Sequence, residues 1–156
     1  MSDQSTVMRQ SLVDAVRAIA SKGLNSGTSG NISLRSGAGG MLITLTGIAP
    51  EKLDQAAMVE MTLDRDWDGE IRPSSEWNMH AAIYKAFPQA QAVVHAHPDH
   101  CVALSCLRQG LPPFHYMIAS FGGDDVPCSD YAPFGTAELA QVVVRALAQR
   151  NTCLIA

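Results

Sequence analysis

The chain has 156 residues, of which 47% are hydrophobic and 17% charged, and its formal net charge is −4. A chain of this length buries roughly 70% of the surface that its unfolded form exposes, so it can form one domain with a hydrophobic core and an internal site. Its composition excludes an intrinsically disordered protein. Its few, scattered basic residues argue against nucleic acid as a partner, because binding along a phosphate backbone needs concentrated positive charge.

Neither a signal peptide nor a membrane anchor is predicted. The first ten residues, MSDQSTVMRQ, lack a charged-then-apolar pattern, and no apolar stretch approaches the roughly 18 residues that a membrane helix needs. We therefore expect a cytoplasmic protein that does not bind membranes. The four cysteines show no Cys-x-x-Cys spacing and most lie in apolar segments, so we expect reduced thiols rather than a disulfide framework.

The first half of the chain mixes helix and strand patterns. Apolar residues at helical spacing predict an opening amphipathic helix, and alternating apolar residues predict strands. In chain order we expect a helix over 7–22, a loop rich in Gly, Ser and Asn over 25–31, strands over 32–35 and 41–45, and a hairpin or surface loop over 64–69.

The second half likewise mixes helices and strands within the same domain. It contains neither a sequence repeat nor an interdomain linker. Ser74 or Ser75 is a natural N-cap for the next helix, and Pro88 lies just past its end. The remaining predicted elements are a buried strand over 90–96, a helix over 99–107, a strand over 114–121, a helix over 137–149 and a buried strand over 153–156.

Two histidines form the strongest candidate for a metal site. His95 and His97 are two residues apart on a predicted strand, so their side chains leave the same face and can converge on one ion. Imidazole suits zinc and other first-row divalent ions, and catalytic zinc takes three protein ligands and keeps one position open. The alternative is two histidines that satisfy local hydrogen bonds at a strand end.

Glu76 adds a carboxylate at the first turn of a predicted helix, where ligands commonly bind. The alternative is a charge that merely stabilises the helix start. His80 lies one turn beyond Glu76, and we interpret it as half of a surface i,i+4 pair rather than a ligand. We do not expect His100 to bind the metal directly; at most it contacts a metal ligand. We expect His115 to have a structural role.

Three short segments offer donors for an anion. The loop over 27–31 supplies glycine amides and small polar side chains, and the pairs Thr46-Gly47 and Ser74-Ser75 supply further donors. Most such loops are plain connections, and neither a Walker lysine nor a GxGxxG pattern follows this one. Donor clusters of this kind beside a metal site would suit a small phosphorylated substrate.

Five sequence motifs occur in a fixed order along the chain. They are GLNSGTSGN at 23–31, LITLTG at 42–47, PSSEW at 73–77, VVHAH at 93–97 and HYMI at 115–118. Together they closely resemble the class II aldolase/adducin family, and the resemblance extends from the first helix to the last residue. Five motifs in the right order are far more specific than any one of them.

The resemblance implies a three-layer α/β/α sandwich around a mostly antiparallel sheet, and a homotetramer with active sites between subunits. It also implies a Zn²⁺ cofactor, or another first-row divalent metal, bound by three histidines and a glutamate; by motif match His95, His97 and Glu76 belong to this set. The implied phosphate-binding residues are Gly30, Asn31, Thr46, Gly47, Ser74 and Ser75. The residues implied to act at the reacting centre are Glu76 and Tyr116, which exchange protons, together with Ser29 and Phe134.

The implied reaction is reversible cleavage of a ketose 1-phosphate to dihydroxyacetone phosphate and a short aldehyde such as L-lactaldehyde. Sugar-phosphate 4-epimerases and keto-acid phosphate decarboxylases share the framework, but the match at 115–118 favours an aldolase. A non-catalytic adducin-like interaction domain is a further alternative, although such domains lack the metal histidines. The family's third histidine follows the segment that matches 153–156, so we expect residues 1–156 to form one domain without the family's C-terminal part.

Overall fold

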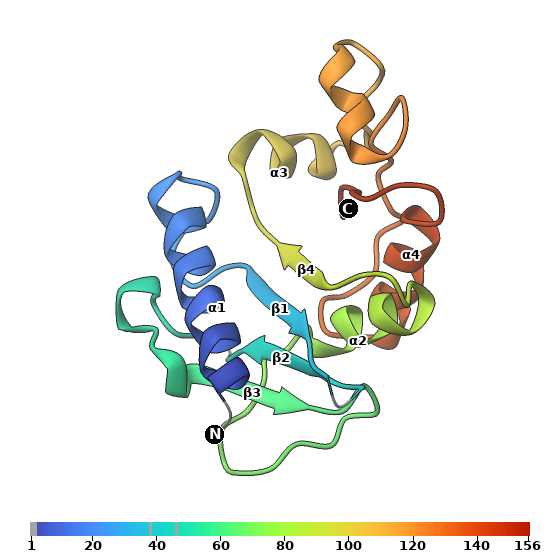
Figure 1. The fold of residues 1–156 in the computed structure, drawn as a ribbon. Helices are drawn as coiled ribbons and strands as arrows, with labels where there is room; N and C mark the ends of the chain where they lie inside the picture. The colour runs from blue at the N-terminus through green and yellow to red at the C-terminus, as the bar shows by residue number, and fades with distance from the viewer. Residues whose placement is uncertain (1–2, 38, 46) are drawn as a thin grey trace.

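A computed structural model describes residues 3–37, 39–45 and 47–156. In this part of the chain an antiparallel four-stranded sheet has the order β3-β2-β1-β4 (Figure 1). The elements are α1 (Asp3–Ser21), β1 (Asn31–Arg35), β2 (Met41–Thr44), η1 (Pro50–Lys52), η2 (Gln55–Ala57), β3 (Met58–Met61), α2 (Trp77–Ala86), β4 (Ala92–His95), α3 (Asp99–Cys106), η3 (Tyr116–Phe121) and α4 (Ala137–Ala146).

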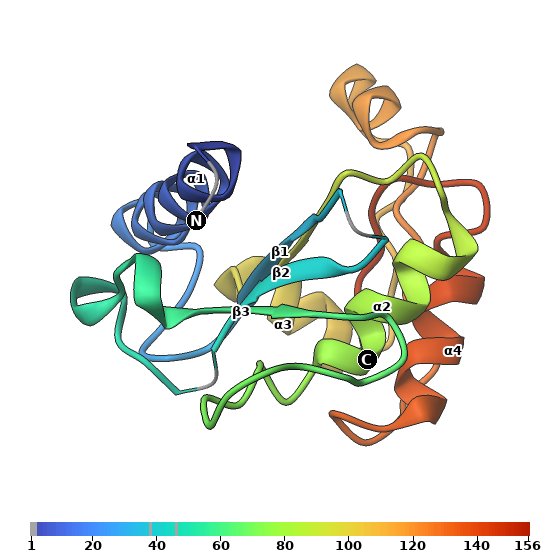
Figure 2. The ribbon, with the colours of Figure 1, turned by 60° about the horizontal axis from the view of Figure 1, so that its bottom comes forward.

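Helices cover both faces of the sheet because side chains alternate along each strand. Leu42 packs with Leu12 of α1 on one face. Its neighbours Met41 and Ile43 pack with Tyr84 of α2 on the other face. Figure 2 shows α1 on one side of the sheet, and α2 with α4 on the opposite side. The three-layer α/β/α arrangement expected from the sequence is therefore confirmed.

Most predicted elements are present within a few residues of their expected bounds, but the strand predicted over 114–121 is wrong. Residues Tyr116–Phe121 form the 3-10 helix η3, which His115 caps by accepting the N–H of Met117 at 3.2 Å. Phe114, Tyr116 and Met117 are exposed, so the apolar pattern there does not reflect burial in a sheet. The short strand β3 was not predicted, and β4, which was expected to be buried, has only exposed and half-buried residues.

Two further expectations need correction. The segment 153–156 is not a regular strand; it makes an isolated parallel bridge between Cys128 and Leu154. Helix α2 begins at Trp77 with Glu76, not a serine, as its N-cap. The hydroxyl of Ser74 accepts the N–H of Glu76 at 3.3 Å, so the serine supports the residue before the helix rather than capping the helix itself.

The cysteines are free thiols, as expected. Burial raises the pKa of the Cys153 thiol to about 12, with a further contribution from Cys128. Within the described residues, none of the helices has both the length and the apolar character needed to cross a bilayer.

Candidate active site

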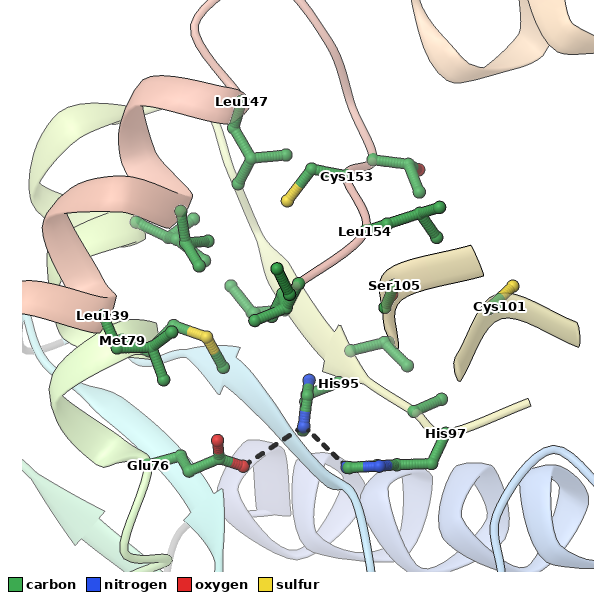
Figure 3. A pocket seen from close by; sticks show the side chains of 18 of the residues that line it. Glu76, Met79, His95, His97, Cys101, Ser105, Leu139, Leu147, Cys153 and Leu154 are labelled. Carbon is green, nitrogen blue, oxygen red and sulfur yellow. Dashed lines mark hydrogen bonds and ion pairs between the residues drawn. The ribbon is translucent and has the colours of Figure 1, made fainter. Parts of the chain in front are cut away.

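Glu76, His95 and His97 meet beside the end of β4, as Figure 3 shows. His95 is the last residue of β4, and His97 follows it by two, which places both imidazoles on one side of the chain. The two Nε2 atoms lie 2.9 Å apart. Oε2 of Glu76, at the start of α2, lies 3.3 Å from Nε2 of His95. The convergence expected from the sequence is therefore present.

The surroundings favour the neutral form of His95. Its side chain is 12% exposed and that of Glu76 14%. Burial lowers the pKa of His95; the Glu76 carboxylate acts in the opposite direction, and His97 reinforces the lowering. Because a metal binds the unprotonated imidazole, this environment keeps His95 in the form that ligation needs.

The donor set fits a zinc-type ion in chemistry and spacing. Two donors bound at 2.0–2.1 Å to one tetrahedral ion lie about 3.3 Å apart. The observed separations of 2.9 and 3.3 Å need shifts of a few tenths of an ångström at most. Across the described residues, however, no group of three His, Cys, Asp or Glu side chains is arranged to hold an ion. The structure therefore supplies a partial donor set.

The loop before β1 holds the histidine segment in place. The backbone N–H of His97 donates to Asn25 Oδ1 at 2.8 Å and to the carbonyl of Leu24 at 3.1 Å. Gly30 adopts a φ of +77°, and a Cβ there would lie 2.7 Å from the carbonyl oxygen of His95 and would also overlap the Asn25 side chain. Glycine is therefore required at position 30 for this close approach.

The predicted phosphate-binding segments are joined through β2. Thr44 accepts the N–H of Ile32 with its hydroxyl at 3.3 Å and the N–H of Ser74 with its carbonyl at 3.0 Å. The start of β1, the end of β2 and the segment just before α2 are thus neighbours. Ser74 is buried and Ser75 exposed. Of the other predicted phosphate ligands, Gly30, Asn31 and Gly47 are described, whereas Thr46 lies outside the described residues.

Asn31 stands opposite His95 in the β1–β4 ladder, and its side chain contacts the candidate catalytic glutamate. Its Nδ2 donates to Oε2 of Glu76 at 2.8 Å. Its Oδ1 lies 2.5 Å from Nε2 of His80. The expectation of a surface position for His80 is therefore wrong: the residue is fully buried, because α2 turns this side chain toward β1.

The remaining candidates lie farther from this centre. Phe134 is 77% exposed and lines, together with the three central side chains, a cavity of about 810 Å³. Tyr116 is 80% exposed on η3, outside the residues that line this cavity. Ser29 donates its hydroxyl to the carbonyl of Ser26 at 2.7 Å and thereby closes the loop. His100 is exposed on α3.

The chain belongs to the class II aldolase/adducin family. A family profile described as "Class II Aldolase and Adducin N-terminal domain" matches residues 10–156. Together with the fold and the Glu76–His95–His97 cluster, this match makes the protein an enzyme of the aldolase lyase class.

Particular relatives are named aldolases. L-fuculose phosphate aldolase from Escherichia coli K12 is 43% identical over 153 residues, which are 98% of this chain and 70% of the relative. The 5-methylthioribulose-1-phosphate/5-deoxyribulose-1-phosphate aldolase of Rhodospirillum rubrum is 42% identical over 149 residues, 96% of this chain and 67% of the relative.

Solved structures agree with these sequence matches. An L-fuculose 1-phosphate aldolase superposes with a TM-score of 0.92 at 35% identity, over the whole chain and 73% of its own length. The L-fuculose-1-phosphate aldolase of Thermus thermophilus gives a TM-score of 0.80 at 30% identity, over 95% of this chain and 74% of its own length.

Proposed function

We propose that the protein is a metal-dependent aldolase that reversibly cleaves a ketose 1-phosphate of the L-fuculose 1-phosphate type. The products would be dihydroxyacetone phosphate and a short aldehyde such as L-lactaldehyde. The observation that carries the proposal is the convergence of a glutamate with two histidines at the end of β4. The E. coli and T. thermophilus relatives named for this substrate support it.

The proposed cofactor is Zn²⁺ or another first-row divalent ion, held by His95, His97 and Glu76. The resemblance to the family implies a third histidine in addition to these. When bound, such an ion supplies positive charge that stabilises the negative charge developing on the substrate oxygens as the carbon–carbon bond breaks. A Schiff-base lysine is not needed for this chemistry.

Two side chains are proposed to move protons. In the direction of condensation, Glu76 removes the proton from the carbon of dihydroxyacetone phosphate that forms the new bond, and Tyr116 protonates the aldehyde oxygen. In the direction of cleavage both transfers are reversed: Tyr116 accepts the hydroxyl proton, the carbon–carbon bond breaks, and Glu76 returns a proton to carbon. Ser29 and Phe134 are proposed to shape the space around the reacting carbons.

The phosphate group is proposed to bind where the loop before β1, the end of β2 and the start of α2 adjoin. Gly30, Asn31, Thr46, Gly47, Ser74 and Ser75 would supply backbone amides and hydroxyls. The hydrogen bonds of Thr44 to both neighbouring segments support this grouping. Short uncharged donors of this kind bind phosphate by approaching its oxygens closely.

A homotetramer with sites between subunits is proposed, in which Tyr116 completes the site of another subunit. The exposure of Tyr116 and Phe134, at 80% and 77%, supports this arrangement because both side chains are free to contact a second chain. We further propose that the enzyme works in the cytoplasm on a small sugar phosphate, without nucleic acid or membrane partners.

A second candidate substrate is 5-methylthioribulose 1-phosphate or 5-deoxyribulose 1-phosphate. The R. rubrum relative named for these compounds is 42% identical, nearly the same as the first. The two substrates share the ketose 1-phosphate half, so the phosphate and metal residues do not distinguish them. Epimerases and decarboxylases of the family use the same framework, but the relatives described above are named aldolases.

The test combines metal analysis with product release from the same full-length preparation. We expect about one zinc per chain, chelator-sensitive release of dihydroxyacetone phosphate, and a loss of about 100-fold or more in kcat for Glu76→Gln. Glu138→Gln, at the first turn of α4, is the matched control and should keep full activity. Zinc without cleavage of either ketose phosphate would reject the aldolase proposal in favour of an epimerase or decarboxylase. Absence of both zinc and cleavage would reject the proposed cofactor together with both proposed substrates.

A further inference from the structure

A line of polar side chains runs from the site into the core between β1 and α2. Glu76, His80 and Tyr84 are spaced four apart, which is a rise of about 6 Å along a helix. Asn31 and Ser33 are spaced two apart, which is a rise of about 6.7 Å along a strand. Because these repeats nearly match, helix and strand residues interleave; we call these five residues the polar seam.

Each neighbouring pair in the polar seam is within hydrogen-bond distance. Oδ1 of Asn31 is 2.5 Å from Nε2 of His80, and Oγ of Ser33 is 2.7 Å from Nδ1 of His80. Ser33 Oγ is also 2.9 Å from the Tyr84 hydroxyl. The side chains of Ser33, His80 and Tyr84 are at most 1% exposed. A continuous, buried hydrogen-bonded chain therefore ends on the carboxylate of Glu76.

The carboxylate of Glu76 at one end and the hydroxyl of Ser33 at the other together fix the direction of the bonds in the polar seam. A carboxylate can only accept, so Nδ2 of Asn31 donates to it and Oδ1 must accept from Nε2–H of His80. Nδ1 of His80 then accepts from the hydroxyl of Ser33, whose oxygen accepts from Tyr84. The Nε2–H of His80, by donating to Oδ1 of Asn31, in turn sets the orientation of the Asn31 amide. A flipped amide would turn its oxygen toward the carboxylate.

We propose that His80 is a positioning residue for Glu76 and acts through Asn31. This inference rests on the proposed function, in which Glu76 exchanges a proton with the substrate carbon. The Asn31 bond holds Oε2 of Glu76 beside His95, and His80 keeps Asn31 in the donating orientation. A merely structural buried histidine would contribute to folding without controlling the geometry of the carboxylate.

The kinetic test compares His80→Gln with His80→Leu in the full-length enzyme. The glutamine amide can still donate to Asn31, whereas leucine fills space without a donor. We expect His80→Leu to lower kcat by about 10- to 100-fold, the loss typical of residues that orient a ligand or catalytic group, with KM nearly unchanged. His80→Gln should recover most of kcat. Ala82→Gly perturbs the same helix on the face that packs with α4 rather than with Tyr84, and is the control for destabilisation.

A second readout does not depend on activity. Crystal structures of the same variants should keep the Asn31–Glu76 hydrogen bond in His80→Gln and lose it in His80→Leu. If His80→Leu does not fold, Ser33→Ala replaces it, because loss of the hydroxyl removes the partner that fixes the imidazole tautomer. Equal kcat losses in the Gln and Leu variants, or an unchanged Asn31–Glu76 bond in the Leu variant, would overturn the inference. If the wild type cleaves no ketose phosphate, the proposed function fails, but the crystal structures still decide the inference.

Discussion

His80 should make the metal-free protein less stable in mild acid. Burial lowers the pKa of His80 from 6.5 to about 3, with a smaller contribution from His95. His80 therefore binds a proton near pH 6.5 in the unfolded chain, but only near pH 3 in the folded protein. Protonation favours the unfolded state, so stability is unaffected above pH 6.5 and falls by about 1.4 kcal/mol per pH unit below it. At about pH 5 the loss is about 2 kcal/mol.

The assay is urea unfolding of chelator-treated protein at about pH 7.5 and pH 5, for the wild type and His80→Gln. Glutamine does not titrate and keeps a donor for Asn31. The difference between the two proteins therefore isolates His80 from other titrating groups, including His95. We expect the wild type to lose about 2 kcal/mol more than the variant between these pH values. Equal losses would refute the reasoning that His80 is buried in its neutral form.

Three further predictions concern other parts of the fold. Gly30→Ala should lower the free energy of unfolding by about 1 to 3 kcal/mol, and by more than Gly27→Ala. Both glycines have a positive φ, but of the two only position 30 would bring a Cβ within 4 Å of other atoms. Equal losses of stability for the two variants in a urea titration would contradict this. At about pH 8 the thiol of Cys153, with its pKa near 12, should react with iodoacetamide about a thousandfold more slowly than an ordinary thiol. The exposed Cys106 serves as the internal reference in peptide mass spectrometry. Similar reaction rates for Cys153 and Cys106 would contradict the burial of Cys153. Arg35→Met should lower the thermal midpoint through loss of about 2 to 4 kcal/mol, because the guanidinium donates to three carbonyls at and beyond the end of α2; a change below about 0.5 kcal/mol would show that these bonds contribute little.

The family and the shared face of the two histidines were readable from the sequence because their signals are local. His95 and His97 needed only the two-residue repeat of a strand to be placed on one face. The alternation of Leu42 with its neighbours likewise predicted a strand. Hydrophobic periodicity was misleading over 114–121, where Ile118 is buried but Phe114, Tyr116 and Met117 are exposed on a 3-10 helix and its approach.

The buried position of His80 could not be predicted from local pattern. A polar residue four positions after Glu76 has the same sequence signature whether the helix presents it to solvent or to a sheet. The three-dimensional packing of α2 on β1 decided the matter, because it buried His80 between Ser33 and Asn31. The sequence repeats of four on the helix and two on the strand are visible in retrospect, but they carry information only once the two elements are known to pack together.

The amino-acid sequence by itself determined the family, the order of the helices and most strands, and the histidine pair, because each depends on residues close together in the chain. The tertiary structure decided which side chains meet across elements: Glu76 with His95, Asn25 with the backbone of His97, and Asn31 between Glu76 and His80. These contacts join positions 19 to 72 residues apart, and two of them depend on which side of α2 packs inward. Such contacts arise from burial of the whole set of apolar faces, which no short segment specifies alone.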